Sequence, residues 1–88
     1  MNFIFSNHAL EQMARRGIDR ETVLLALNQP QQVVEDTDDI DVLIYQSLIK
    51  ENEQLFLLRI FVDCIKQPNV IITLYKTTKI AKYYESEI

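Results

Sequence analysis

The chain has 88 residues, 48% of them hydrophobic, and its thirteen acidic against nine basic residues give a net charge of −4. This length suits one compact domain around a single core and is too short for two, so we expect one domain over residues 1–88. The acidic balance argues against a general nucleic-acid binder, because phosphate affinity comes largely from lysine and arginine.

Cys64 is the only cysteine, which excludes an intrachain disulfide and leaves no cysteine cluster for a metal. The sequence shows neither a secretory signal nor an apolar run near the ~20 residues that span a bilayer, so we expect a cytoplasmic protein without a membrane contact. Nothing in the composition calls for a metal or another cofactor.

The front of the chain predicts a short strand followed by two helices. Residues 1–5 are apolar and aromatic and stop at a serine and an asparagine, residues 6–7, either of which can cap a helix by accepting a backbone N–H. Gly17 tolerates the left-handed conformation that ends a helix, and Asp19 then offers a cap for a second helix, which Pro30 limits. We expect two antiparallel helices of about ten residues each, joined by a tight turn.

Three apolar runs follow the predicted helices, at residues 42–49, 55–62 and 70–77, and short polar segments separate them. They predict an antiparallel meander. Residues 33–34 add an edge strand to it, and the acidic segment 35–41 forms either a loop or an edge protected against aggregation. The expected fold is therefore α+β: a short N-terminal strand, a two-helix hairpin, an antiparallel sheet of three to four strands and a short C-terminal segment.

Alternation along the second and third runs assigns two faces to this sheet. One face is wholly apolar, and we expect the two helices to cover it; it holds Phe56, Leu58, Ile60, Val62, Val70, Ile72 and Leu74. The other face carries the remaining side chains of these runs, namely Leu55, Leu57, Arg59, Phe61, Ile71, Thr73, Tyr75 and Thr77.

Arg59 is the charged residue in this second, largely apolar face. A guanidinium in such surroundings needs a partner or an anionic ligand that offsets its loss of water. An internal acid is one solution, supplied by Asp63, by segment 35–41, by Glu85 or by Glu87. A bound phosphate or carboxylate is the other, since arginine holds such anions through paired hydrogen bonds. The sequence leaves both open.

The segment from His8 to Ile18 sets one imidazole and two guanidiniums on the first predicted helix. Helical spacing gives that helix a polar face with His8, Glu11, Gln12 and Arg15. Its apolar face carries Leu10, Met13, Ala14 and the following Ile18. His8 fits two roles, an acid or base near neutral pH or an uncharged residue that fixes the helix entry. Arg15 and Arg16 fit a phosphate site or simply the negative end of the helix dipole.

The last quarter of the chain is locally basic. Four lysines alternate there with three tyrosines, in the order Lys66, Tyr75, Lys76, Lys79, Lys82, Tyr83 and Tyr84. Such a mixture suits RNA, because lysines meet phosphates and aromatic rings stack on bases. It equally suits an ordinary solvated strand and helix.

The order of these elements, together with the motif from His8 to Ile18, resembles a small bacterial domain family of unknown function that is placed with the RelE/ParE toxin superfamily. The matching positions cover nearly the whole chain: His8, Ala9, Met13, Arg16, Gly17, Ile18, Val23, Asn28, Pro30 and residues 73–77. The resemblance implies a RelE/ParE-like fold and a toxin-like component of a type II toxin–antitoxin module, with an antitoxin protein and RNA as partners.

RNA cleavage, the activity of the RelE branch, needs a base for the ribose 2′-hydroxyl, an acid for the leaving oxygen and fixed positive charge at the phosphate. The resemblance then makes His8, Arg59, Tyr75 and Lys76 the catalytic candidates, without a metal. The RNA-binding candidates are Arg15, Arg16, Lys79, Lys82 and Tyr83.

The alternative is a non-catalytic protein-interaction or dimerisation module of the same fold. Its binding surface is the second face of the sheet, with Leu55, Leu57, Phe61, Ile71 and Tyr75. A face this apolar needs a cover, which is either a C-terminal helix over residues 80–84 or a partner chain such as a second copy.

Overall fold

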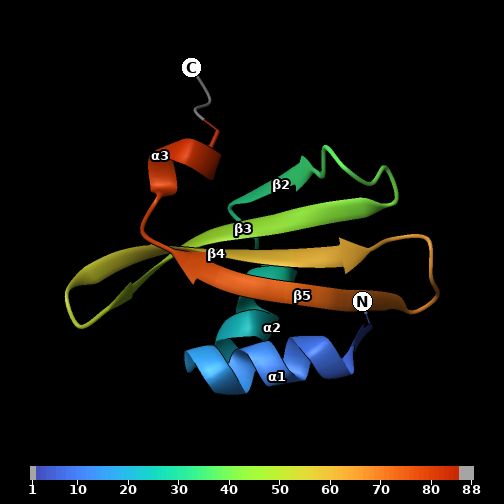
Figure 1. Ribbon diagram of the computed structural model, residues 1–88, viewed down its shortest axis with the longest axis horizontal. Helices are drawn as coiled ribbons and strands as arrows, with labels where there is room; N and C mark the ends of the chain where they lie inside the picture. Colours follow the sequence, from blue (N-terminus) through green and yellow to red (C-terminus); the bar gives the residue numbers. More distant parts are fainter. Residues whose placement is uncertain (1, 86–88) are drawn as a thin grey trace.

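The computed structural model describes residues 2–85 and shows one sheet with helices on both faces (Figure 1). The elements in chain order are β1 (Phe3–Phe5), α1 (Asn7–Arg16), α2 (Arg20–Asn28), β2 (Gln32–Glu35), β3 (Val42–Glu51), β4 (Gln54–Asp63), β5 (Asn69–Thr77) and α3 (Ile80–Tyr83). The five strands lie in the order β1-β5-β4-β3-β2. The expected α+β class is confirmed.

The sheet is larger than the three or four antiparallel strands expected, and it is mixed. β2 forms the edge beside β3, as residues 33–34 suggested, and β1 adds a fifth strand at the opposite edge. β1 runs parallel to β5, with Phe5 opposite Ile71. A parallel partner this distant in sequence leaves no trace in local alternation, so the pattern of residues 1–5 indicates a strand but not its neighbour.

Two polar side chains begin the first two helices, as their types predict. The Ser6 hydroxyl accepts the Ala9 N–H at 3.0 Å and donates to the Ile72 carbonyl at 2.8 Å. It therefore both caps α1 and ties the helix to β5. Asp19 accepts the Thr22 N–H at 2.8 Å and caps α2 in the same way.

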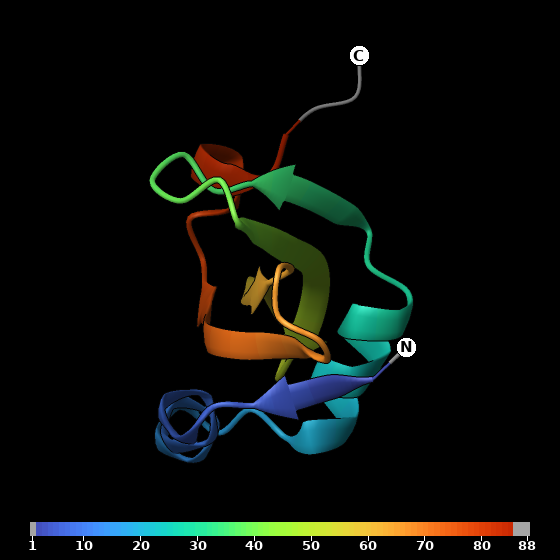
Figure 2. The ribbon, with the colours of Figure 1, turned by 90° about the vertical axis from the view of Figure 1, so that its right-hand side faces the viewer.

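Gly17 ends α1 in the left-handed conformation, at φ 65°, where a side chain would be strained. The lengths of α1 and α2, 10 and 9 residues, agree with expectation. Their antiparallel pairing is not confirmed, because α1 packs mainly on β5 and α2 on β3. Figure 2 shows α1 end-on and α2 from the side, so each helix lies on its own part of the sheet.

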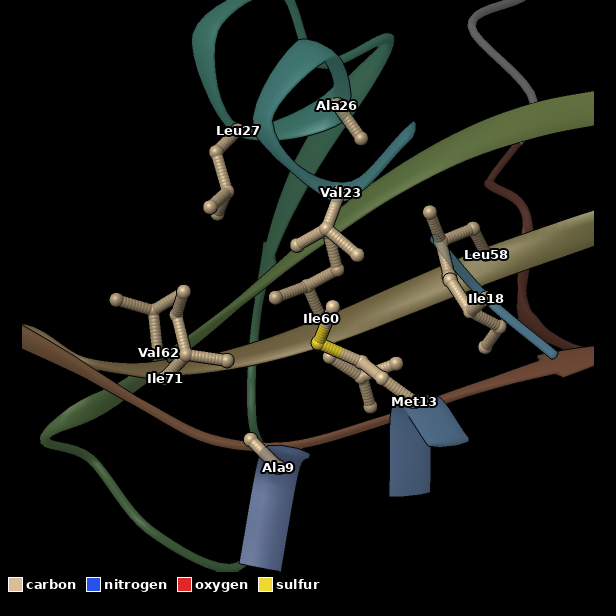
Figure 3. Close-up of a cluster of buried hydrophobic side chains, with 11 residues drawn as sticks. Ala9, Met13, Ile18, Val23, Ala26, Leu27, Leu58, Ile60, Val62 and Ile71 are labelled. Atoms are coloured by element: carbon tan, nitrogen blue, oxygen red, sulfur yellow. The ribbon is translucent and has the colours of Figure 1, made fainter. Parts of the chain in front are cut away.

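The hydrophobic core lies between the sheet and these two helices (Figure 3). Its central strand is β4, whose Leu58, Ile60 and Val62 are completely buried, as alternation predicts. The helices and the link between them contribute Ala9, Met13, Ile18, Val23, Ala26 and Leu27. At about 25 cal/mol per Å² of apolar surface removed from water, this contact is the main source of stability in so small a domain.

Strand β5 departs from the simple alternation predicted for it. The register between β4 and β5 shifts at Phe61 and Val62, so that Val62 faces Ile71 and Ile72 has no place opposite it. Ile71 is therefore buried in the core, whereas Ile72 is 36% exposed. A bulge of this kind inserts one residue and exchanges the faces on either side of it. The expected assignment of Ile71 and Ile72 is wrong for this reason.

Helix α3 lies on the face of the sheet opposite α1 and α2, as the two views agree (Figures 1 and 2). Of the two covers left open for the second face, the C-terminal helix is present, over residues 80–83 rather than 80–84. Within residues 2–85, no helix combines the length and the apolar character that a membrane crossing needs.

The cap of α2 makes stability depend on pH. The Thr22 backbone N–H, and after it the Thr22 hydroxyl, lower the pKa of the Asp19 carboxyl. A lowered folded-state pKa stabilises the fold above the ordinary pKa of about 3.9, and this stabilisation is lost as the pH falls through the folded value. We expect Asp19→Ala to lower the urea midpoint at neutral pH, with a smaller difference from wild type at about pH 2.5.

The matched control is Asp19→Asn, which keeps a capping oxygen that does not titrate. It should lose less stability than Asp19→Ala at neutral pH. Equal differences from wild type at both pH values would show that the carboxylate charge plays no part in the cap.

Candidate functional site around Arg59

Arg59 occupies the middle of the sheet, on the face that α1 and α2 leave free. The register of the three central strands sets it between Gln46 of β3 and Tyr75 of β5. Its Nε donates to Gln46 Oε1 at 2.6 Å, and its Nη1 donates to the Tyr75 hydroxyl at 2.6 Å. Only 8% of the residue is exposed, so neighbouring strands fix the guanidinium from both sides.

Aromatic rings supply the rest of its surroundings. The guanidinium carbon lies 4.1 Å from the centre of the Tyr83 ring, which α3 places above it. The Phe61 and Tyr75 rings follow at 5.4 and 5.7 Å. Ring faces attract a cation and replace part of its lost hydration, so these three rings stabilise a charge that water does not reach freely.

A chain of amide side chains holds α3 in this position. Gln46 Nε2 donates to the Tyr83 carbonyl at 3.2 Å and to Gln32 Oε1 at 2.9 Å. Gln32 in turn donates to the Glu85 carbonyl and accepts the Glu85 N–H. The edge strand β2 and the segment after α3 are thus linked through the residue that also binds Arg59.

The hydrogen-bond partners of Arg59 are neutral, so the internal acid, one of the two solutions expected from the sequence, is not found among the described residues. Among the described residues, Arg59 forms no ion pair; Asp63 and Glu85 do not reach it, and Glu87 lies outside the described residues. A buried charge is costly unless hydrogen bonds and dipoles stabilise it. Here two neutral acceptors and three rings do so, and the positive charge stays uncompensated by any carboxylate contact.

A pocket of about 390 Å³ opens over this cluster. Arg59, Tyr75, Tyr83 and Lys82 contribute to its lining, and so does the acidic stretch 35–38 that follows β2. When Glu85 is included, four carboxylates and two cations line it, so the pocket holds charges of both signs with an excess of negative charge.

Tyr83 is the titratable group that this arrangement perturbs. A hydrogen bond from the Tyr75 hydroxyl, then one from Lys82, and lastly the positive charges of Lys82 and Arg59 lower the pKa of the Tyr83 phenol. Each of these contacts favours the phenolate over the neutral phenol. A lowered pKa increases the fraction of the phenol that is present as phenolate, which is the form that accepts a proton.

The residues predicted to form a site fall into two groups on opposite faces of the sheet. Arg59 and Tyr75 of the catalytic set meet Lys82 and Tyr83 of the RNA-binding set in this pocket, and Lys79 is exposed at the start of α3. His8, Arg15 and Arg16 lie exposed on α1, across the sheet (Figure 1).

Lys76, the remaining catalytic candidate, points to the other side of β5. It stands opposite Leu58, whose side chain lies in the core between the sheet and the helices. Its Nζ pairs with Glu51 Oε1 at 2.6 Å and lies 5.2 Å from the centre of the Phe56 ring. These contacts place Lys76 in a salt bridge at the hairpin end of the sheet, away from Arg59.

Sequence reasoning did not single out Gln46 or Gln32. Gln46 interrupts an otherwise apolar run and is completely buried. That interruption was the available signal, because a polar residue inside a predicted central strand needs a partner on the same face of the neighbouring strand. Its partner, Arg59, becomes evident only from the register of β3 against β4.

The surface predicted for a non-catalytic interaction module is not open. Two of its members, Leu57 and Ile71, are completely buried, the first on this face and the second in the core behind it. Phe61 and Tyr75 are partly covered in the Arg59 cluster. Leu55 is 43% exposed and remains as an isolated apolar residue near the β3–β4 turn.

Residues 5–76 match the protein family described as a domain of unknown function, DUF4258. The chain belongs to this family. The DUF4258 match includes Gln46, Arg59 and Tyr75 and ends at Lys76, before the α3 residues that cover them. No curated protein and no solved structure matches the chain significantly.

Within residues 2–85, no three His, Cys, Asp or Glu side chains lie close enough together to share a metal ion. The chemistry available in the pocket of this DUF4258 chain is that of a guanidinium, an ammonium group, two phenols and four carboxylates. The two cations can bind an anion, and the phenols and carboxylates can exchange protons.

The lowered pKa of Tyr83 is directly measurable. We expect a spectrophotometric titration of the tyrosines to show an early step that disappears in Tyr83→Phe. Tyr75→Phe removes the largest cause of the shift and should move that step to higher pH. Tyr84→Phe is the matched control, one residue further along, and should keep the early step; its loss there would assign the step to the wrong phenol.

Proposed function

We propose that this DUF4258 chain is a toxin-like component of a bacterial type II toxin–antitoxin module, that it has a RelE/ParE-like fold, and that it cleaves RNA without a metal. It would act in the cytoplasm and be held inactive by an antitoxin protein. The observation that carries the proposal is the buried Arg59 guanidinium, which no described carboxylate neutralises and which faces a pocket with two phenols and a lysine.

Arg59 keeps binding capacity for a phosphate. A guanidinium has five N–H donors, and the contacts to Gln46 and Tyr75 use two of them within the described chain. The same two contacts hold its plane in a fixed orientation. A cation held in a fixed orientation stabilises developing negative charge without having to reorganise during the reaction.

Tyr83 and Lys82 supply the proton transfers in this proposal. The Tyr83 phenolate takes the proton of a ribose 2′-hydroxyl, and the 2′-oxygen then attacks phosphorus and forms a new O–P bond. The bond from phosphorus to the 5′-oxygen of the next nucleotide breaks as a proton from the Lys82 ammonium reaches that oxygen. The products are a 2′,3′-cyclic phosphate and a free 5′-hydroxyl, and proton exchange with water restores both residues.

Tyr75 is a positioning residue in this scheme, because it bonds Arg59 and lowers the pKa of Tyr83. Mutual reach favours Tyr83 over His8 as the base, since His8 lies on α1 across the sheet from the pocket. Lys76, paired with Glu51, is likewise assigned no step.

We expect the purified protein to cleave a fluorescently labelled RNA oligonucleotide and to leave its DNA counterpart intact, because DNA lacks the attacking 2′-hydroxyl. Arg59→Gln and Tyr83→Phe should each lower the rate about 100-fold. Tyr75→Phe should shift the rise of the rate with pH to higher pH, which a loss of packing alone does not do. His8→Ala and Lys76→Ala, which change candidates outside the pocket, should retain activity.

Intact RNA after incubation with folded wild-type protein, together with normal growth of a bacterial host that expresses it, would overturn the ribonuclease proposal. Equal loss in Arg59→Gln and His8→Ala would place the site elsewhere. A stable dimer by sedimentation velocity in a protein that cleaves no RNA would favour the non-catalytic interaction module.

The acidic stretch beside the pocket should restrain RNA binding through repulsion of the phosphate backbone. We therefore expect the double variant Glu35→Gln and Asp38→Asn to bind the same oligonucleotide more tightly, with the largest gain at low salt. Asp36 is left unchanged because its carboxylate accepts the Asp38 N–H and shapes the loop. The control is the double variant Glu11→Gln and Glu53→Gln, which removes the same number of charges at exposed positions outside the pocket; an equal gain there would indicate a net-charge effect alone.

A further inference from the structure

Along residues 47–51, no described strand pairs with the outer edge of β3. β2 pairs with β3 from Glu35 opposite Leu43 to Gln32 opposite Gln46, and no described strand continues along that edge. β3 itself runs on to Glu51 with only β4 beside it (Figure 1). A free strand edge presents backbone donors and acceptors that can pair with another chain.

The backbone groups of Leu48 and Lys50 point outward from this edge. The Asp36 N–H donates to the Val42 carbonyl from the β2 side, and in an antiparallel strand every second residue turns its N–H and C=O to the same edge. The Leu48 N–H is bound by the Gln31 side chain at 2.9 Å. The Leu48 carbonyl and both Lys50 groups have no protein partner within residues 2–85.

A groove of about 570 Å³ runs beside these free groups, between β3 and α2. Leu25 and Ala26 of α2 and Ile49 of β3 give it an apolar wall. Leu25 is 61% exposed, so its side chain is accessible to a bound segment. The groove therefore has room for apolar side chains that project from a chain lying along the edge.

Lys50 adds a charge on the other side of that edge. It lies two residues after Leu48 and four after Gln46, so its side chain shares the face of the sheet that carries Arg59 rather than the face that α2 covers. It is exposed and forms no ion pair in the described chain, whereas its neighbour Glu51 is paired with Lys76.

We infer that residues 48–51, together with Leu25, form a strand-addition site for an extended segment of a partner protein in which apolar and acidic residues alternate. A segment paired with the edge sends alternate side chains to opposite faces, so its apolar residues enter the α2 groove and its acidic residues meet Lys50. A second copy of this chain is a poorer occupant, because on the face of Lys50 its own β3 edge brings another Lys50, while its Glu51 lies on the groove side and is paired with Lys76.

This site lies apart from the Arg59 pocket, and the two share no lining residue. Strand addition therefore goes beyond the proposed RNA cleavage, and one can fail while the other holds.

The test uses a defined peptide, acetyl-Glu-Val-Glu-Val-Glu-Val-Glu-amide, and isotope-labelled full-length protein. We expect its addition to shift the amide NMR signals of residues 48–51 and the methyl signals of Leu25. Two matched probes separate the contributions: the same peptide with lysine for glutamate, and the same peptide N-methylated at alternate residues so that it cannot donate to the edge. Each should bind roughly tenfold more weakly or worse.

Substitutions at the β3 edge and in the α2 groove test whether the peptide binds there. Lys50→Pro removes an outward N–H and no bond between β3 and β4, and edge strands tolerate proline at such positions. Leu25→Asp puts a charge in the groove. Both should abolish the shifts, while Leu10→Asp, at a leucine of α1 that is 43% exposed, should keep them. RNA cleavage, where present, should be unchanged in all three.

Three results would overturn the inference. They are the absence of shifts at millimolar peptide, shifts that survive Leu25→Asp or N-methylation of the probe, and a concentration-dependent dimer in sedimentation velocity that Lys50→Pro abolishes. The last result would show that a second copy of the chain, and not a segment of another protein, pairs with the β3 edge. If Lys50→Pro does not fold, Leu25→Asp and the N-methylated probe still decide the question.

Discussion

The burial of one positive charge without a carboxylate partner organises the whole second face of this protein. Arg59 stands on the central strand, and Gln46 and Tyr75 from both neighbouring strands bind its guanidinium. The Tyr83 ring closes over it from α3. Because an unassisted buried charge is costly, the strand register, the amide chain through Gln46 and the position of α3 are interdependent. The same cluster lines part of the pocket for which we propose RNA chemistry.

A chain of 88 residues thus covers both faces of a five-stranded sheet, with different means on each. On one face α1 and α2 bury a purely apolar core. On the other, the four-residue α3 and the edge strand β2 enclose a polar and aromatic cluster. The division has a physical basis, since long amphipathic helices bury much apolar area, whereas a short helix serves mainly to place a few side chains.

Local features of this fold were predictable and distant ones were not. The caps at Ser6 and Asp19 and the helix end at Gly17 follow from neighbouring residues, and the faces of β4 follow from alternation. The parallel partner of β1 and the bulge in β5 depend on contacts between remote segments. Part of the candidate site was also predictable, because Arg59, Tyr75 and Tyr83 can be singled out from the sequence. The separation of His8 from them follows from the position of α1 across the sheet, which local patterns do not indicate.

The pairing of β1 with β5 also bears on how the chain folds during synthesis. Ser6, at the end of β1, bonds the carbonyl of Ile72, 66 residues later. At about 5 to 20 residues per second, a ribosome needs roughly 3 to 13 seconds to make the intervening chain. Through that interval β1 lacks its sheet partner and α1 lacks the strand on which it packs. This edge of the sheet therefore forms only after β5 has been synthesised, and its formation costs the entropy of closing the long intervening loop.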